Sequence, residues 1–189
     1  MRNSIRSTEI SLPNDARTDV QMKRITTERL TLDVIREVDF DALITLFKDE
    51  MVSNTYMVPY MPSLEDEKRL FTSILQLSRR QDQYVYGIFL TNRLIGIIND
   101  TEISGKEIEL GYALNPKYFS MGYMTEALRG LITHLFDQGF ERVICGAFDH
   151  NASSIRVMEK CGMSKMSKVE DIEYRGTSHK CIYYSISRK

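Results

Sequence analysis

The spacing of apolar residues changes several times along the chain, and each change predicts a new element. From Arg24 an alternation of apolar and polar residues predicts a strand that reaches about Ile35. A helical spacing follows, opened by Asp39 or Asp41 and ending near Val52. The alternating apolar residues are Leu30, Leu32 and Val34, and the apolar side of the helix consists of Leu43, Ile44, Leu46 and Phe47.

A second helix and three strands are predicted in the middle of the chain. Ser63, with Asp66 three residues later, is typical of a helix start, because a serine hydroxyl and an acidic first turn both stabilise free N–H groups. Turn residues at Asn92 and Gly105 then separate three strands, which predicts an antiparallel meander. The three strands are expected over residues 84–91, 93–99 and 106–114.

Strands alternate with helices in the last third of the chain. An amphipathic helix after Pro116 is stopped by Gly139, and Gly162 closes a second helix. Because a strand, helix, strand order needs crossover connections, some strands must pair in parallel. The sequence therefore predicts a mixed α/β fold around one central sheet. The expected strands cover residues 142–148, about 163–170 and 180–187, and the second helix covers 151–160.

Length and composition favour a single globular domain. The chain has 189 residues, and we expect a polar N-terminal extension over residues 1–22 followed by one domain over 23–189. With 42% hydrophobic and 27% charged residues, the chain is neither disordered nor of low complexity. A net charge of −1 gives no general attraction to nucleic acid or to an anionic membrane. A small-molecule or protein substrate is favoured instead.

Location and metal content are also constrained by the sequence. The longest uncharged stretch, residues 51–64, contains two prolines and several polar residues, so we expect no membrane span. No apolar block of secretory length follows the N-terminal charges, which favours a cytoplasmic protein. The three cysteines lack CxxC spacing and the three histidines are scattered, so we expect reduced thiols and no metal site. The cysteines are Cys145, Cys161 and Cys181.

Candidate chemistry concentrates between residues 109 and 163. The strand ELGYAL leads through NPKYF into SMGYMTEAL, where a helix begins. The first N–H groups of a helix have no partner within it and lie at the positive end of its dipole, so such a turn can cradle a diphosphate. Gly122 allows a ligand to approach this backbone closely.

Together with TERLTL at 27–32 and RLIGII at 93–98, this stretch resembles the GNAT superfamily of acyl-CoA N-acyltransferases, in particular the branch of ribosomal-protein N-terminal acetyltransferases. The resemblance covers about residues 24–187. It implies a single mixed sheet with splayed strands flanked by about four helices, and acetyl-CoA as co-substrate. It also implies a cofactor site composed of Ala113, Leu114, Phe119, Ser120, Met121, Gly122, Tyr123, Met124, Thr125 and Asn151.

The sequence departs from the superfamily at three positions. The phosphate-loop pattern is Gln or Arg, two residues, Gly, one residue, then Gly or Ala, and it falls here on Phe119, Gly122 and Met124. Only the central glycine matches, but the cradle consists mainly of backbone. Many members also carry a tyrosine that protonates the leaving thiolate, and that position is Met158 here. The resemblance suggests that Ser154 or a water replaces it.

Ser154 gains its candidate role from its place in a helix. Asn151 is a good N-cap and Gly162 a good C-cap, and these structural roles alone explain both residues. Ser154 is then the third helical residue, close to free N–H groups and the positive helix end, where a departing thiolate would be stabilised. A surface serine without a catalytic role is the alternative.

A candidate base lies on the strand before the phosphate loop. Alternation places Glu109 on one face together with small residues at 111 and 113. An α-amine with a pKa near ~8 loses its proton readily, so a modest base suffices. Glu109 is our candidate, directly or through a water, with Glu107 and Glu102 as rivals and a solvated carboxylate as the alternative. The resemblance further implies that a backbone N–H near residues 113–114 polarises the thioester.

Two segments are expected to frame the acceptor. Residues 51–63 contain the apolar side chains Tyr56, Met57, Tyr60 and Met61, which otherwise belong to the core. We expect residues 170–179 to form a loop whose acidic residues Glu170, Asp171 and Glu173 attract a cationic amine, unless they are merely solvated.

These observations predict direct acetyl transfer from acetyl-CoA to a primary amine, such as a protein N-terminus or a small molecule. We expect no covalent intermediate, metal, nucleic-acid partner or membrane partner, and a monomer or homodimer. A non-catalytic acyl-CoA-binding sensor of the same fold is the main alternative. A nucleotide-binding fold of Rossmann type is disfavoured, because no glycine-rich turn follows the first strand.

Overall fold

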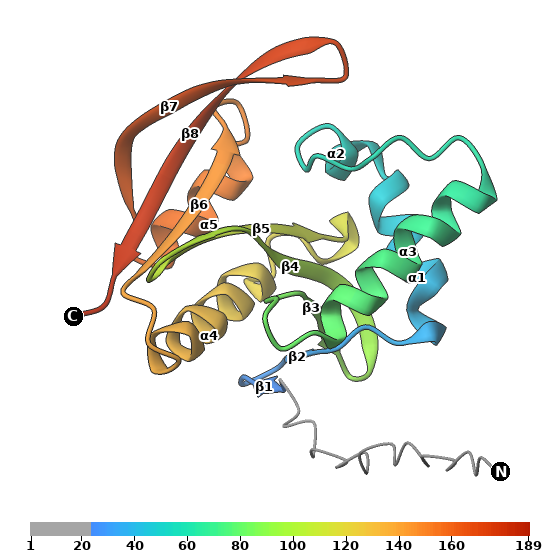
Figure 1. The fold of residues 1–189 in the computed structure, drawn as a ribbon, viewed down its shortest axis with the longest axis horizontal. Helices are drawn as coiled ribbons and strands as arrows, with labels where there is room; N and C mark the ends of the chain where they lie inside the picture. Colours follow the sequence, from blue (N-terminus) through green and yellow to red (C-terminus); the bar gives the residue numbers. More distant parts are fainter. Residues whose placement is uncertain (1–23) are drawn as a thin grey trace, which may run out of the picture.

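One eight-stranded sheet organises residues 24–189, the part of the chain that the computed structural model describes (Figure 1). The strand order is β1-β2-β3-β4-β5-β6-β8-β7, and every neighbouring pair is antiparallel except β5 and β6. The strands are β1 (Ile25–Thr26), β2 (Thr31–Asp33), β3 (Tyr86–Leu90), β4 (Arg93–Ser104), β5 (Glu107–Leu114), β6 (Arg142–Phe148), β7 (Ser164–Tyr174) and β8 (Thr177–Ser187). The predicted mixed sheet is therefore confirmed.

Helices cover both faces of this sheet. One large core packs α4 and α5 against it, and a second core packs α1 and α3 against its other face. The helices are α1 (Phe40–Lys48), α2 (Glu50–Ser53), α3 (Leu64–Arg79), α4 (Tyr123–Asp137) and α5 (Ala152–Lys160), with short 3-10 turns η1 (Glu37–Asp39) and η2 (Pro116–Tyr118). Among the described residues, no helix is both long and apolar enough to cross a membrane.

The sheet divides between β5 and β6. These strands pair only from Glu107–Leu110 to Arg142–Cys145, whereas β6 pairs with β8 along its whole length. Beyond Leu110 the two strands follow different partners, and in Figure 1 β6, β7 and β8 rise away from β4 and β5. The backbone groups of β5 that would have faced β6 are thus available to a ligand.

Most local predictions are confirmed by the structure. Ser63 and Asp66 form a reciprocal capping box at the start of α3. The strand predicted over 142–148 has the observed bounds of β6, and α4 buries its predicted apolar stripe. Gly139 and Gly162 both take positive φ after their helices, as expected for helix stops.

Three local predictions were wrong. The first strand is interrupted between β1 and β2, where Thr27 and Leu30 form a turn. The helix expected to reach Val52 ends at Lys48, because Asp49 is extended and caps α2 by accepting from the Met51 N–H at 2.9 Å. The predicted loop over 170–179 is the end of the β7–β8 hairpin, which turns at Arg175 and Gly176. The expected extension over residues 1–22 lies outside the described residues.

Candidate active site

The start of α4 presents a run of backbone N–H groups. Gly122 is its N-cap with φ of +80°, a left-handed conformation that glycine adopts without strain. No side chain caps this end of the helix through the N-cap residue. The first helical bond is donated by the Glu126 N–H to the Gly122 carbonyl. The backbone N–H groups of Ser120 to Thr125 donate no hydrogen bond to any residue within 24–189. Free N–H groups at the start of a helix are able to bind a diphosphate, so this turn stays our candidate for the cradle.

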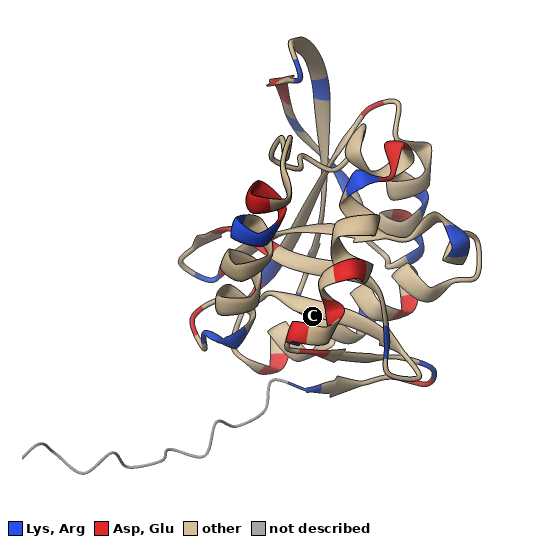
Figure 2. Cartoon of the chain, turned by 90° about the vertical axis from the view of Figure 1, so that its right-hand side faces the viewer, with Lys and Arg blue, Asp and Glu red and all other residues tan. Residues whose placement is uncertain are grey.

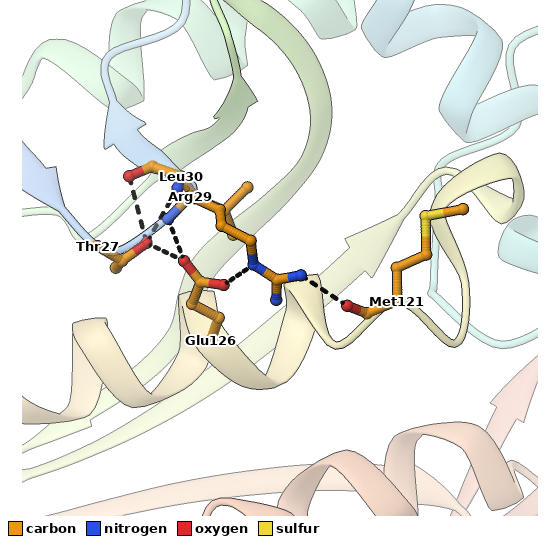
Figure 3. A network of polar contacts seen from close by, with 5 residues as sticks. All are labelled: Thr27, Arg29, Leu30, Met121 and Glu126. Atoms are coloured by element: carbon orange, nitrogen blue, oxygen red, sulfur yellow. Dashed lines mark hydrogen bonds and ion pairs between the residues drawn. The ribbon is translucent and has the colours of Figure 1, made fainter.

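Arg29 and Glu126 hold this turn in place (Figure 3). The Glu126 carboxylate accepts from the Thr27 hydroxyl at 2.6 Å, the Arg29 N–H at 2.7 Å and the Arg29 Nε at 2.7 Å. Arg29 Nη1 then donates to the Met121 carbonyl at 3.1 Å, and its guanidinium lies 4.5 Å from the Tyr123 ring centre. These contacts join the β1–β2 turn to α4 and lower the pKa of Glu126, although burial opposes them. No local pattern in the sequence indicates this connection.

The two side chains that depart from the phosphate-loop pattern do not crowd the cradle. Met124 is 5% exposed and packs in the main core, and Phe119 packs against the same core. Both residues therefore present backbone to the turn. The Phe119 N–H already donates to the Pro116 carbonyl at 3.1 Å, so the available donors begin after it.

The end of β5 offers a second backbone donor. Asn115 donates its N–H to the Ile95 carbonyl at 2.8 Å, so the Asn115 N–H is directed toward β4. Bonding direction alternates along an antiparallel strand, so Ala113 faces β4 while Leu114 directs its N–H toward the splay. Of the two residues expected to polarise a thioester, Leu114 is the one with the suitable direction.

Ser154 lies across the splay in the first turn of α5. The Asn151 Oδ1 accepts from the Ser154 N–H at 3.1 Å, which confirms the predicted N-cap, and the Asn151 Nδ2 donates to Ser154 Oγ at 3.1 Å. No acceptor for the Ser154 hydroxyl proton exists among the residues described. Met158, where the superfamily often has tyrosine, is fully buried.

Tyr112 is a residue of this site that the sequence analysis did not single out. Its hydroxyl donates to the Ser154 carbonyl at 3.1 Å, and this bond connects β5 to α5 across the splay. Burial raises the pKa of Tyr112 well above its ordinary value, which keeps the phenol protonated and able to donate. Tyr112 thereby fixes the spacing between β5 and Ser154.

The Asn151 cap can be tested apart from chemistry. We expect Asn151→Ala to lower the free energy of unfolding by about 1 kcal/mol, because the Ser154 N–H loses its acceptor. Asn151→Asp keeps an acceptor and should retain nearly full stability. Urea denaturation of the two variants measures the difference, and equal stability of Asn151→Ala and the unmodified protein would contradict the cap.

Glu109 lies on β5, one residue before the last pair with β6, which joins Leu110 to Cys145. Its carboxylate accepts from the Thr101 hydroxyl at 3.1 Å and lies 3.9 Å from the Lys168 Nζ. Burial raises the pKa of Glu109, while Thr101 and Lys168 act in the opposite direction. A base with a raised pKa is better matched to neutral pH than an ordinary carboxylate.

The rival carboxylates are less well placed. Glu107 is two residues further from the splay and pairs with Arg142 at 3.0 Å. Glu102 is exposed on β4 opposite Glu109. Glu109 is therefore the carboxylate of this group nearest the splay.

The two segments expected to frame the acceptor meet each other. The Tyr56 hydroxyl donates to Asn99 Oδ1 at 2.5 Å, and the Tyr56 ring stacks on Phe47. Tyr56 therefore belongs to the core and also lies beside Gly111 of β5. Tyr174, near the hairpin tip, donates to the Ser53 carbonyl at 2.7 Å. A hollow of about 680 Å³ lies beside this contact, lined by Val58, Pro59, Tyr60, Tyr174 and Arg175.

The negative patch predicted on residues 170–179 is weaker than its sequence indicates. Asp171 pairs in register with Lys180, and Glu170 contacts both Lys168 and the Tyr183 hydroxyl. The hairpin, at the top of Figure 2, carries both signs of charge. Glu170 is thus paired with a cation and Asp171 lies opposite one, rather than in an isolated anionic loop.

The three cysteines lie in the interior of the protein. All three are free and buried, and burial raises the pKa of the Cys161 thiol to about 11 and that of Cys145 further. Such thiols remain protonated and are poor nucleophiles at neutral pH. No group of three or more metal-ligating side chains occurs within residues 24–189.

Comparisons with known proteins show the family of this chain. The family described as Acetyltransferase (GNAT) domain matches residues 29–164. The uncharacterized N-acetyltransferase YoaA of Bacillus subtilis is 26% identical over 166 residues, which cover 85% of this chain and 94% of YoaA. An acetyltransferase (GNAT family) from Bacillus anthracis has a TM-score of 0.75 and 25% identity, covering 87% of this chain and 98% of that one.

A further solved structure shares the fold and contains a ligand. RimL, a ribosomal L7/L12 alpha-N-protein acetyltransferase in complex with coenzyme A, has a TM-score of 0.78 at 22% identity, covering 87% of this chain and 98% of RimL. The splayed sheet and the open turn at α4 define an N-acyltransferase fold. The chain belongs to the GNAT acetyltransferase family, and it is an acetyltransferase of that family.

Proposed function

We propose that the protein transfers an acetyl group from acetyl-CoA to a primary amine by direct attack in the cytoplasm. The observation that carries this proposal is the run of free N–H groups at the start of α4, together with the β5–β6 splay. The N–H groups are suited to phosphates, and the splay is suited to an extended pantetheine arm. Residues Ser120–Thr125 would hold the diphosphate, with Phe119 and Asn151 positioning the two helix starts.

Each chemical step has a residue suited to it. Glu109 takes the proton of the acceptor, directly or through a water, so that the free amine attacks the thioester carbon. The Leu114 N–H, supported by Ala113, stabilises the oxyanion that forms. The tetrahedral intermediate loses one proton from its nitrogen to water and expels the thiolate of coenzyme A, and Ser154 or a water gives a proton to the sulfur. No step needs a covalent bond to the protein.

The acceptor is a cationic primary amine in this proposal. Glu109 lies near the splay and Glu170 contacts the same lysine, Lys168, so the two carboxylates favour such a ligand. The amine is either a protein N-terminus or a small molecule, and RimL, whose fold this chain shares, is named for a ribosomal-protein acceptor. Release of free thiol from acetyl-CoA, measured against peptides, polyamines and aminoglycosides, tests the proposal. Binding of coenzyme A without turnover of any amine would favour the non-catalytic sensor.

We expect Ser154→Ala to lower kcat by about tenfold, less than is typical for loss of a general acid. A thiol with a pKa near ~8.5 is a good leaving group and needs little protonation. The affinity for coenzyme A should change little, because the Asn151 cap remains. Thiol release at saturating acetyl-CoA measures kcat, and an unchanged kcat would assign the proton to water.

A further inference from the structure

Lys168 of β7 places a cation beside the candidate base. Its Nζ lies 3.9 Å from Glu109 Oε2, 3.5 Å from Glu170 Oε1 and 4.0 Å from the centre of the Tyr183 ring. The Tyr183 hydroxyl in turn donates to Glu170. Two carboxylates and the face of an aromatic ring thus surround one ammonium group.

This surrounding is the environment that a protonated amine substrate needs. Carboxylates form charge-assisted hydrogen bonds with an ammonium, and an aromatic face adds a cation–π attraction. The group also lies where chemistry is proposed, because Glu109 pairs with Ile144 one level before the β5–β6 ladder ends at Leu110 and Cys145. An acceptor amine approaching Glu109 would meet Lys168 already in place.

Lys168 is able to leave this position. Its side chain is 37% exposed, and it stands where the β7–β8 register shifts between Lys165 and Val169. A lysine has four flexible carbons and pairs through a single point charge, so it can move to solvent without disturbing the strand. Partly exposed ion pairs of this kind contribute little stability.

We propose that Lys168 is an internal competitor for the acceptor: its ammonium occupies the position between Glu109 and Glu170 that the cationic amine takes during acetyl transfer. The inference rests on the proposed function and adds how the acceptor is admitted. Binding exchanges one cation for another, so the two carboxylates never face each other uncompensated. Glu109 then accepts a proton from the bound ammonium, which leaves a free amine for attack on the thioester.

Lys168→Met tests the competition, because methionine keeps much of the side-chain volume and removes the charge. We expect its KM for the amine to fall by about fivefold, the equivalent of one partly exposed ion pair, with kcat and the KM for acetyl-CoA within about twofold of the unmodified enzyme. Lys165→Met is the matched control: Lys165 is an exposed lysine on the same strand, with no ion pair to any described residue, and its loss should change neither constant.

The assay uses the full chain at pH 8 and the amine that the unmodified enzyme acetylates fastest in the panel. A KM for the amine that rises or stays unchanged in Lys168→Met would overturn the competition while leaving the proposed function intact. A large loss of kcat would also overturn it, because Lys168 would then take part in the reaction. Absence of turnover with every amine in the unmodified enzyme would contradict the proposed function itself.

Discussion

Replacing Glu109 by glutamine should lower kcat/KM for the amine by about a hundredfold or more. Glutamine preserves the shape of the side chain but cannot take a proton, and a positioned general base contributes roughly 10²–10⁴ in rate. The loss should appear while coenzyme A still binds, since Glu109 belongs to β5 and not to the turn before α4. Thiol release and calorimetric titration with coenzyme A measure the two effects separately.

The pH profile provides a second test of Glu109. The base acts as a carboxylate, so activity is lost as the pH falls through its pKa, and burial places that pKa above the ordinary carboxyl range. The unmodified enzyme should therefore show an acidic limb that Glu109→Gln lacks. Glu107→Gln, which removes a carboxylate from the same strand, is the control and should keep the limb. An unchanged limb in Glu109→Gln would assign the base elsewhere.

Replacing Arg29 by alanine should raise the dissociation constant for coenzyme A by about tenfold. The side chain holds both Glu126 and the Met121 carbonyl, so its loss releases the turn whose N–H groups are proposed to bind the diphosphate. Ordering that turn would then be part of the cost of binding. Calorimetry on the purified variants measures the constant directly.

Arg24→Ala is the matched control for Arg29. Arg24 is also an exposed arginine near the same sheet edge, but it pairs with Asp33 at 3.8 Å and does not touch the turn. We expect its affinity for coenzyme A to match that of the unmodified protein. If Arg29→Ala binds coenzyme A with unchanged affinity, the turn keeps its shape without the arginine and the positioning role is wrong.

Periodic segments could be predicted from the sequence because their signals are local. The apolar stripe of α4 and the bounds of β6 follow from side chains within one element. The hairpin end of β7 had no such signal, since most of its residues are exposed and polar. Its strand pairing is visible only once β8 lies beside it.

Contacts between distant residues could not be predicted in the same way. The sequence indicates only that Glu126 is an acidic residue in the first turn of a helix. In the structure its carboxylate accepts a hydrogen bond from Arg29, which is 97 residues away in the chain. Tyr112 packs against the main core, but its hydroxyl bond to the Ser154 carbonyl depends on the spacing of β5 and α5. The sequence contains no signal that Lys168 lies beside Glu109, because the two residues are on different strands and the register of β7 shifts near Lys168.

The most direct measurement is the amide NMR spectrum of the nitrogen-15-labelled protein during titration with coenzyme A. The account predicts that the N–H signals of Gly122, Tyr123, Met124 and Thr125 shift most and saturate together, since these groups would bind the diphosphate. Pantetheine, which lacks the diphosphate, should leave those four signals in place and move signals near Leu114. Saturating coenzyme A that leaves the α4 turn unshifted would contradict the account.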